Sequence, residues 1–127
     1  MHGDSLCTDD KAYMEFRQMV RQPAWQQQVL SLPLAQRRVM AAQLRQQSQS
    51  LNAVKAEDIM DVNQSEVEAR MSFWGVNILI HGHTHRPYKH KFDIQSVSAE
   101  RWVLGDWSNN FWWIEVNNGW ALEKSPT

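Results

Sequence analysis

The chain has 127 residues, of which 43% are hydrophobic and 21% charged, and its formal net charge at neutral pH is −1. This composition is typical of a soluble globular protein with its own core, and the length allows one domain at most. The sequence contains no long uncharged apolar run and does not open with a basic and then apolar leader, so it predicts neither a transmembrane helix nor a signal peptide. A single cysteine, Cys7, excludes an internal disulfide and a zinc site made of several cysteines.

Charge is distributed unevenly along the chain. Residues 1–10 carry a net charge of −3, residues 11–55 carry +6, and residues 56–127 carry −4. The central basic block favours an anionic partner, which is a phosphate-bearing ligand, an anionic membrane surface or a nucleic acid, although a solvated helical face is an equal alternative. Six of the seven tryptophans follow residue 73, in the acidic part of the chain, which counts against a stacking platform for nucleic acid.

Residues 11–49 predict a helical hairpin or triplet. A first helix follows the capping residues Thr8 to Asp10 and ends near Gln22, and two further runs are separated by Pro33. Residues 46–50, rich in serine and glutamine, indicate a loop or a helix end, and a fourth helix runs from about residue 63 to Met71. The apolar positions at helical spacing in the first three runs are Tyr13, Phe16, Met19, Val20, Trp25, Val29, Leu30, Leu34, Val39, Met40 and Leu44.

The last third of the chain predicts one small sheet. Residues 76–80 are short, mostly apolar and rich in β-branched side chains, which is typical of a buried strand feeding a tight loop. Residues 101–104 and 111–116 are two more strands, and residues 117–119 form a hairpin turn that leads into residues 120–122.

The histidines are the clearest candidates for functional residues in the sequence. His81, His83 and His85 follow the first predicted strand, and His2 belongs to a second group with a neighbouring glycine and aspartate. Imidazole and carboxylate groups are ligands for manganese, zinc or iron, and two such ions close together can bind a phosphate and activate water. The alternative is that these histidines only make hydrogen bonds in a loop, while His90, between two lysines, is expected at the surface.

Two short motifs resemble a known superfamily. Residues 1–4, Met-His-Gly-Asp, and residues 82–85, Gly-His-Thr-His, are similar to the last two motifs of the calcineurin-like metallophosphoesterases. Residues 2–10, 59–63 and 80–87 resemble, within that superfamily, the UDP-2,3-diacylglucosamine pyrophosphatase family of lipid A biosynthesis. The resemblance covers most of the chain, including the helical block and the final hairpin.

The resemblance implies a fold and a domain organisation. The expected class is α/β (α+β): the C-terminal half of a metallophosphoesterase β-sandwich flanked by helices. Residues 1–127 would be a single partial domain, and residues 11–55 a helical cap inserted within it. Members of the family carry an N-terminal half with further metal motifs and a bridging aspartate, which this sequence lacks, so the missing half is an expected partner in cis or in trans.

The resemblance also implies the site residues. His2 and His83 match ligands of one of two Mn²⁺ ions, and His85 matches a ligand of the other. His83 is in addition the expected catalytic residue, because it lies against the substrate phosphates in that family. The positions that match binding residues for the uridine-diphospho-sugar, besides His83, are Asp10, Ser48, Asn52 and Lys55.

The implied function is metal-dependent hydrolysis of the pyrophosphate of UDP-2,3-diacylglucosamine to UMP and 2,3-diacylglucosamine 1-phosphate. The two metal ions would polarise the α-phosphorus and activate the attacking water, and the protein would be cytoplasmic, peripheral on the inner membrane of a Gram-negative bacterium. We expect the isolated chain to be inactive or nearly so, because the bridging carboxylate is absent. The alternative is a non-catalytic remnant that binds anionic lipid or membrane, and no nucleic acid is expected as a partner.

Overall fold

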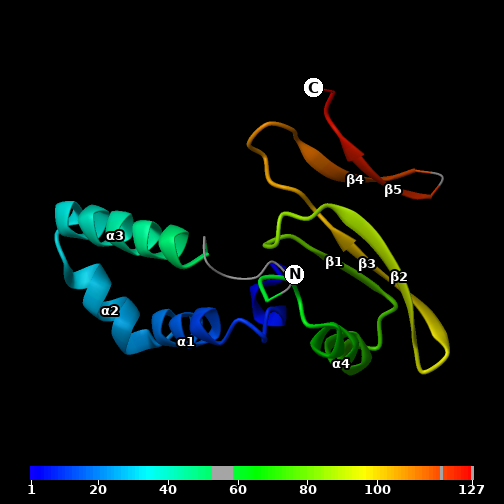
Figure 1. Cartoon of the computed structure of the whole chain (residues 1–127), viewed down its shortest axis with the longest axis horizontal. Coiled ribbons are helices and arrows are strands. Elements are labelled where there is room, and N and C mark those ends of the chain that lie inside the picture. The colour runs from blue at the N-terminus through cyan, green and yellow to red at the C-terminus, as the bar shows by residue number, and fades with distance from the viewer. Residues whose placement is uncertain (53–58, 118, 127) are drawn as a thin grey trace. The chain divides into compact units, whose positions relative to one another are not determined.

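The computed structural model describes residues 1–52, 59–117 and 119–126. The chain forms two compact units (Figure 1): one is Asp9–Met60, and the other combines Met1–Thr8 with Asp61–Thr127. None of the helices in these described ranges is long and apolar enough to cross a membrane. Helices and strands are both present, so the expected mixed α+β class is confirmed at that level.

The helical unit contains α1 (Lys11–Val20), α2 (Pro23–Ser31) and α3 (Leu34–Asn52), as the sequence predicts. The side chain of Asp10 caps α1 by accepting a hydrogen bond of 3.0 Å from the backbone N–H of Tyr13. Pro23 occupies the first position of α2. A backbone N–H at this position would have no hydrogen-bond partner within the helix, so the lack of one in proline costs nothing. Residues 46–50 belong to the last turns of α3, so of the two predicted alternatives they form a helix end and not a loop.

The second unit begins with the short 3-10 helix η1 (Asp4–Leu6) and resumes with α4 (Gln64–Trp74). The Asn63 side chain caps α4 by accepting from the Glu66 N–H, and Gly75 ends it in the left-handed conformation, so α4 is longer than predicted. The strands are β1 (Ile78–His81), β2 (Tyr88–Ile94), β3 (Val97–Val103), β4 (Trp112–Val116) and β5 (Trp120–Lys124).

The expectation of one small sheet is wrong, because the strands form two. The first has the order β1-β3-β2, with β1 parallel and β2 antiparallel to β3, and the second is the predicted hairpin of β4 and β5. The sequence interpretation missed β2 and the first half of β3. Their turn is made by Gln95 and Ser96 at positive φ of 50° and 68°, without the glycine or asparagine that usually announces such a turn. His90 lies in β2 and is half-buried.

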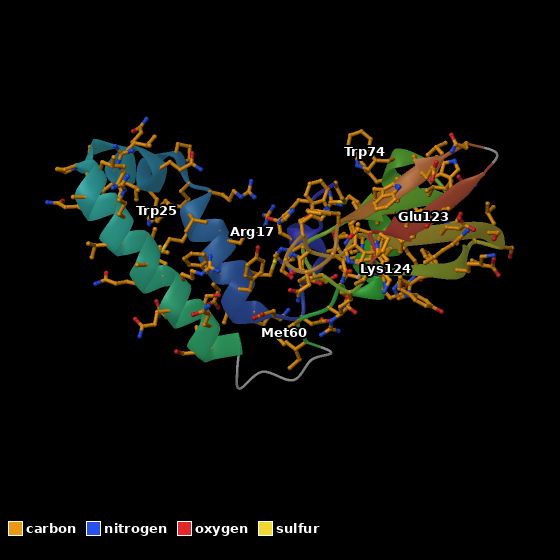
Figure 2. The ribbon with its side chains drawn as sticks, turned by 90° about the horizontal axis from the view of Figure 1, so that it is seen from above. Arg17, Trp25, Met60, Trp74, Glu123 and Lys124 are labelled. Atoms are coloured by element: carbon orange, nitrogen blue, oxygen red, sulfur yellow. The ribbon has the colours of Figure 1, made fainter. Side chains whose placement is uncertain are left out.

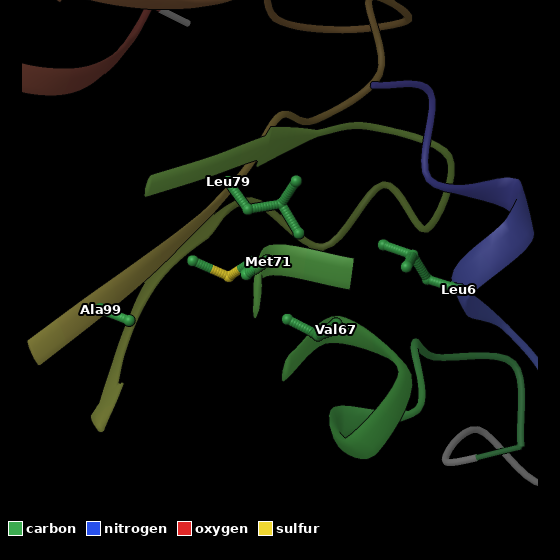
Figure 3. Close-up of a cluster of buried hydrophobic side chains, with 5 residues drawn as sticks. All are labelled: Leu6, Val67, Met71, Leu79 and Ala99. Carbon is green, nitrogen blue, oxygen red and sulfur yellow. The ribbon is translucent and has the colours of Figure 1, made fainter. Parts of the chain in front are cut away.

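A small core joins the two segments of this unit. Leu6 of η1, Val67 and Met71 of α4, Leu79 of β1 and Ala99 of β3 are buried together (Figure 3). The backbone N–H of Asn63 also donates to the Leu6 carbonyl over 2.8 Å. Burial of these apolar side chains therefore holds the start of the chain against β1, next to the loop that carries the histidines.

Candidate functional site

Two glycine-containing turns meet at the carboxyl end of β1. The Gly82 N–H donates to the His2 carbonyl over 2.9 Å, and the amino group of Met1 donates to the Ile80 carbonyl over 2.8 Å. Gly3 has a φ of +110°, and a Cβ at this position would lie 2.8 Å from Nδ1 of His81. Only glycine allows this approach without strain, so the residue between His2 and Asp4 is dictated by the packing of the two turns.

The turns bring His2 and His83 into direct contact. Nδ1 of His83 lies 3.2 Å from Nε2 of His2, and the ring centroids are 5.0 Å apart in an edge-to-face arrangement. Two imidazole nitrogens that each lie about 2.1 Å from one ion are about 3.0–3.4 Å apart at octahedral and tetrahedral angles. The pair therefore has the separation of two ligands of one metal ion, as a shared site requires.

The third predicted ligand does not join them. His85 is exposed, and both His83 and His85 have positive φ, 66° and 53°. Positive φ in a residue other than glycine is strained and is concentrated at functional sites. Within the described residues, however, no group of three or more His, Cys, Asp or Glu side chains could hold a metal ion.

His81 is buried in the same region and has both ring nitrogens engaged. Its Nδ1 lies 2.8 Å from the Gly82 carbonyl, and its Nε2 lies 3.1 Å from Nη1 of Arg101 in β3. Burial lowers the pKa of His81 and the charge of Arg101 adds to this, while the Gly82 carbonyl and the Asp61 carboxylate act in the opposite direction. Because both of its ring nitrogens are engaged, His81 is not available as a further ligand.

An ion pair fixes the loop that follows His85. Nη1 of Arg86 lies 3.2 Å from Oδ2 of Asp61, whose other oxygen accepts the Val62 N–H over 2.7 Å. Two of the stretches that carry the family resemblance, residues 59–63 and 80–87, thus meet in space through this pair.

The predicted substrate-binding residues other than His83 belong to the helical unit. Asp10 is buried as the cap of α1. Ser48 lines an apolar groove of about 230 Å³ between α1 and α3, whose other lining residues include Tyr13, Phe16 and Leu51. Lys55 lies outside the described residues, and so does the side chain of Asn52.

The sequence interpretation missed the Arg101–His81 contact and the Asp61–Arg86 pair. The sequence did contain one indication of the Arg101 contact. Arg101 begins a predicted strand that is otherwise apolar, and a charged residue is rarely buried without a partner. The Asp61–Arg86 pair depends on two loops that only the fold brings together.

Comparison with known proteins identifies homologues of this chain. No family model matches the chain. It is 56% identical to the UDP-2,3-diacylglucosamine hydrolase of Cellvibrio japonicus over 127 residues, which is 100% of this chain and 50% of that protein. It is 47% identical to the hydrolase of the same name from Marinobacter nauticus, over 99% of this chain and 52% of that protein.

This chain is a homologue of the UDP-2,3-diacylglucosamine hydrolases. A third relative of that name, from Chromohalobacter salexigens, is 55% identical over 89% of this chain and 46% of its own length. The chain spans about half the length of the curated hydrolases it matches. The resemblance of residues 2–10, 59–63 and 80–87 to the UDP-2,3-diacylglucosamine pyrophosphatase family is thereby confirmed.

Proposed function

We propose that this chain contributes the metal-binding histidines of a hydrolase that cleaves the pyrophosphate of UDP-2,3-diacylglucosamine. The observation that carries the proposal is the 3.2 Å contact between the His2 and His83 nitrogens, in a chain whose relatives are named for that substrate. In the reaction, water adds to the α-phosphorus and the bond to the sugar phosphate breaks. UMP and 2,3-diacylglucosamine 1-phosphate are then the products.

His2 and His83 would hold one Mn²⁺ ion and His85 would contribute to a second. Neutral imidazole is a good ligand for such ions, and when bound they supply Lewis-acid polarisation of the phosphate. His83 would also contact the phosphate, with its backbone fixed in the left-handed conformation at a φ of 66°. The remaining ligands would come from polypeptide equivalent to the other half of the relatives, in cis or in trans, within a metallophosphoesterase sandwich.

The helical unit suits the rest of this substrate. Residues 11–55 carry a net charge of +6, which complements a pyrophosphate. The groove between α1 and α3 is apolar and about 230 Å³ in volume, which suits an acyl chain, with Ser48 in its lining. Asp10, Asn52 and Lys55 complete the proposed contacts to the uridine-diphospho-sugar, and the unit would cap the site at the inner-membrane surface of a Gram-negative bacterium.

A chimera tests the proposal. This chain replaces the matched half of the Cellvibrio japonicus hydrolase, and UMP release from UDP-2,3-diacylglucosamine is measured in Mn²⁺. We expect the chimera to release UMP and the isolated chain to release little or none, because too few ligands are assembled in it. A folded but inactive chimera would contradict the proposal, and so would turnover by the isolated chain near that of the intact hydrolase.

The second candidate is a non-catalytic module that binds anionic lipid. It is favoured by the net charge of +6 over residues 11–55 and by the apolar groove between α1 and α3, neither of which needs a metal. Co-sedimentation with anionic vesicles that persists in chelator, weakens with salt and accompanies an inactive chimera would favour this candidate over the hydrolase.

A further inference from the structure

A buried arginine contacts the strand that ends at the histidine loop. Arg101 is 5% exposed, and in the parallel register of β1 and β3 it is paired with Leu79, two residues before His81. Side chains two residues apart on a strand share a face, so Arg101 is the diagonal neighbour of His81. The contact between Nη1 of Arg101 and Nε2 of His81, at 3.1 Å, follows from this register.

The burial of this charge is only partly compensated. Nε of Arg101 is buried without a hydrogen-bond partner, and burial lowers the pKa of the guanidinium, while the Asp61 carboxylate opposes that shift. A buried cation is expensive, and an apolar residue of similar volume often stabilises a fold as well or better. An arginine buried at this cost therefore indicates a role beyond packing.

The two contacts of His81 fix which ring nitrogen carries the proton. A guanidinium can only donate, so Nε2 of His81 must be the acceptor. A carbonyl can only accept, so Nδ1 must carry the proton and donate a hydrogen bond to the Gly82 oxygen over 2.8 Å. Arg101 thus selects the tautomer of His81 that holds the Gly82 peptide.

Gly82 in turn is linked to both candidate ligands, through its N–H on one side and its carbonyl on the other. Its N–H donates to the His2 carbonyl over 2.9 Å, and His83 follows it directly in the chain. Nδ1 of His81 also sets how closely the Gly3 turn can approach, since a Cβ on Gly3 would lie 2.8 Å from it. Hydrogen bonds therefore link Arg101 to His81 and His81 to the Gly82 carbonyl, and the N–H of the same glycine links it to His2.

We propose that Arg101 and His81 are positioning residues, which hold His2 and His83 at the separation of two ligands of one metal ion. This inference rests on the proposed function, in which His2 and His83 bind one metal ion. Positioning partners of metal ligands commonly change metal affinity by tenfold or more when they are removed.

The test uses the full chain with ¹⁵N-labelled histidines. Without metal, nitrogen shifts report the tautomer of His81, and the nuclear Overhauser effect between the His2 and His83 rings reports their contact. We expect a single tautomer with the proton on Nδ1, and in Arg101→Met a mixture of tautomers with a weaker ring contact. The Mn²⁺ concentration that half-broadens the His2 and His83 signals should rise about tenfold in this variant.

Matched variants separate positioning from general stability. Arg70→Met removes an arginine from a partly exposed pair with Glu66 on α4 and should change none of these readouts. His81→Asn keeps a donor for the Gly82 carbonyl, so it should retain more Mn²⁺ affinity than His81→Phe. An Nε2-protonated His81 in the unaltered chain would overturn the inference, and so would a folded Arg101→Met with unchanged ring contact.

The outcomes also distinguish this inference from the proposed function. If Arg101→Met does not fold, the positioning role is tested by the His81 tautomer in the unaltered chain and by the Mn²⁺ affinities of His81→Asn and His81→Phe. If Mn²⁺ broadens neither histidine in the unaltered chain, the proposed metal pair is contradicted. The tautomer and the ring contact, both measured without metal, still support or overturn the positioning role.

Discussion

At the scale of single residues, the close approach of two backbone turns determines which residue can stand at Gly3. Gly3 and Gly75 both have positive φ, +110° and +62°, but only Gly3 has neighbours within 4 Å of the place where a Cβ would stand. We expect Gly3→Ala to lower the free energy of unfolding by about 3 kcal/mol, through backbone strain plus the clash with His81. Gly75→Ala carries the strain alone and should lower it by about 1 kcal/mol. Urea denaturation measures both, and equal losses would show that the clash relaxes freely.

His90 gives the chain an acid sensitivity. Burial, with the charge of Arg101 on the neighbouring strand, lowers the pKa of His90 below its ordinary value, while the Asp61 carboxylate opposes the shift. The unfolded chain therefore binds a proton at a higher pH than the folded chain, so stability falls as pH drops from about 6.5 toward the lowered pKa. His90→Thr should reduce this pH dependence, to which the buried His81 also contributes, and urea denaturation at a series of pH values measures the change. An unchanged slope would contradict the assignment.

At the scale of elements, local signals predicted the helices and missed one strand. Pro23, Pro33 and Asn63 mark helix boundaries by their own chemistry, so α1 to α4 could be predicted from sequence. Strand β2 alternates aromatic and apolar residues with charged ones, but the turn that follows it lacks glycine. Its pairing with β3 is part of the tertiary structure and cannot be predicted from local sequence. The same limit applies to the site. The motifs indicate His2 and His83, whereas the Arg101–His81 contact depends on the register of β1 and β3.

Helix α4 offers a direct test of the core. Met71 is 1% exposed and Phe73, two residues later in the same helix, is 75% exposed. Met71→Ala should lower the free energy of unfolding by about 2–5 kcal/mol, because it leaves a cavity among Leu6, Val67 and Leu79. Phe73→Ala should change it by no more than about 0.5 kcal/mol. Similar losses in the two variants would mean that α4 does not pack on this core.

At the scale of the whole molecule, apolar burial is concentrated in one unit. All the buried hydrophobic side chains of the described residues belong to the unit with the sheets, and α1 and α2 contain no buried residue. Six of the seven tryptophans also lie in that unit, and Trp25 of α2 is the exception, labelled in Figure 2. The helical unit of the isolated chain should therefore be the less stable of the two.

Two optical signals can separate the units during urea denaturation. Far-ultraviolet circular dichroism reports mainly the helices, and tryptophan fluorescence reports mainly the unit with the sheets. We expect the circular dichroism signal to be lost at lower urea than the fluorescence signal. Coincident transitions would indicate a single cooperative unit instead.

Manganese content and UMP release of the chimera, measured on the same preparations, test most directly whether His2 and His83 hold a metal ion in a hydrolase. His2→Ala and His83→Ala are compared with His90→Thr, whose histidine lies in β2. We predict that the first two variants lose bound Mn²⁺ and UMP release together, by about a hundredfold in rate, while His90→Thr keeps both. A folded His83→Ala chimera with unchanged manganese content and unchanged UMP release would contradict the proposal.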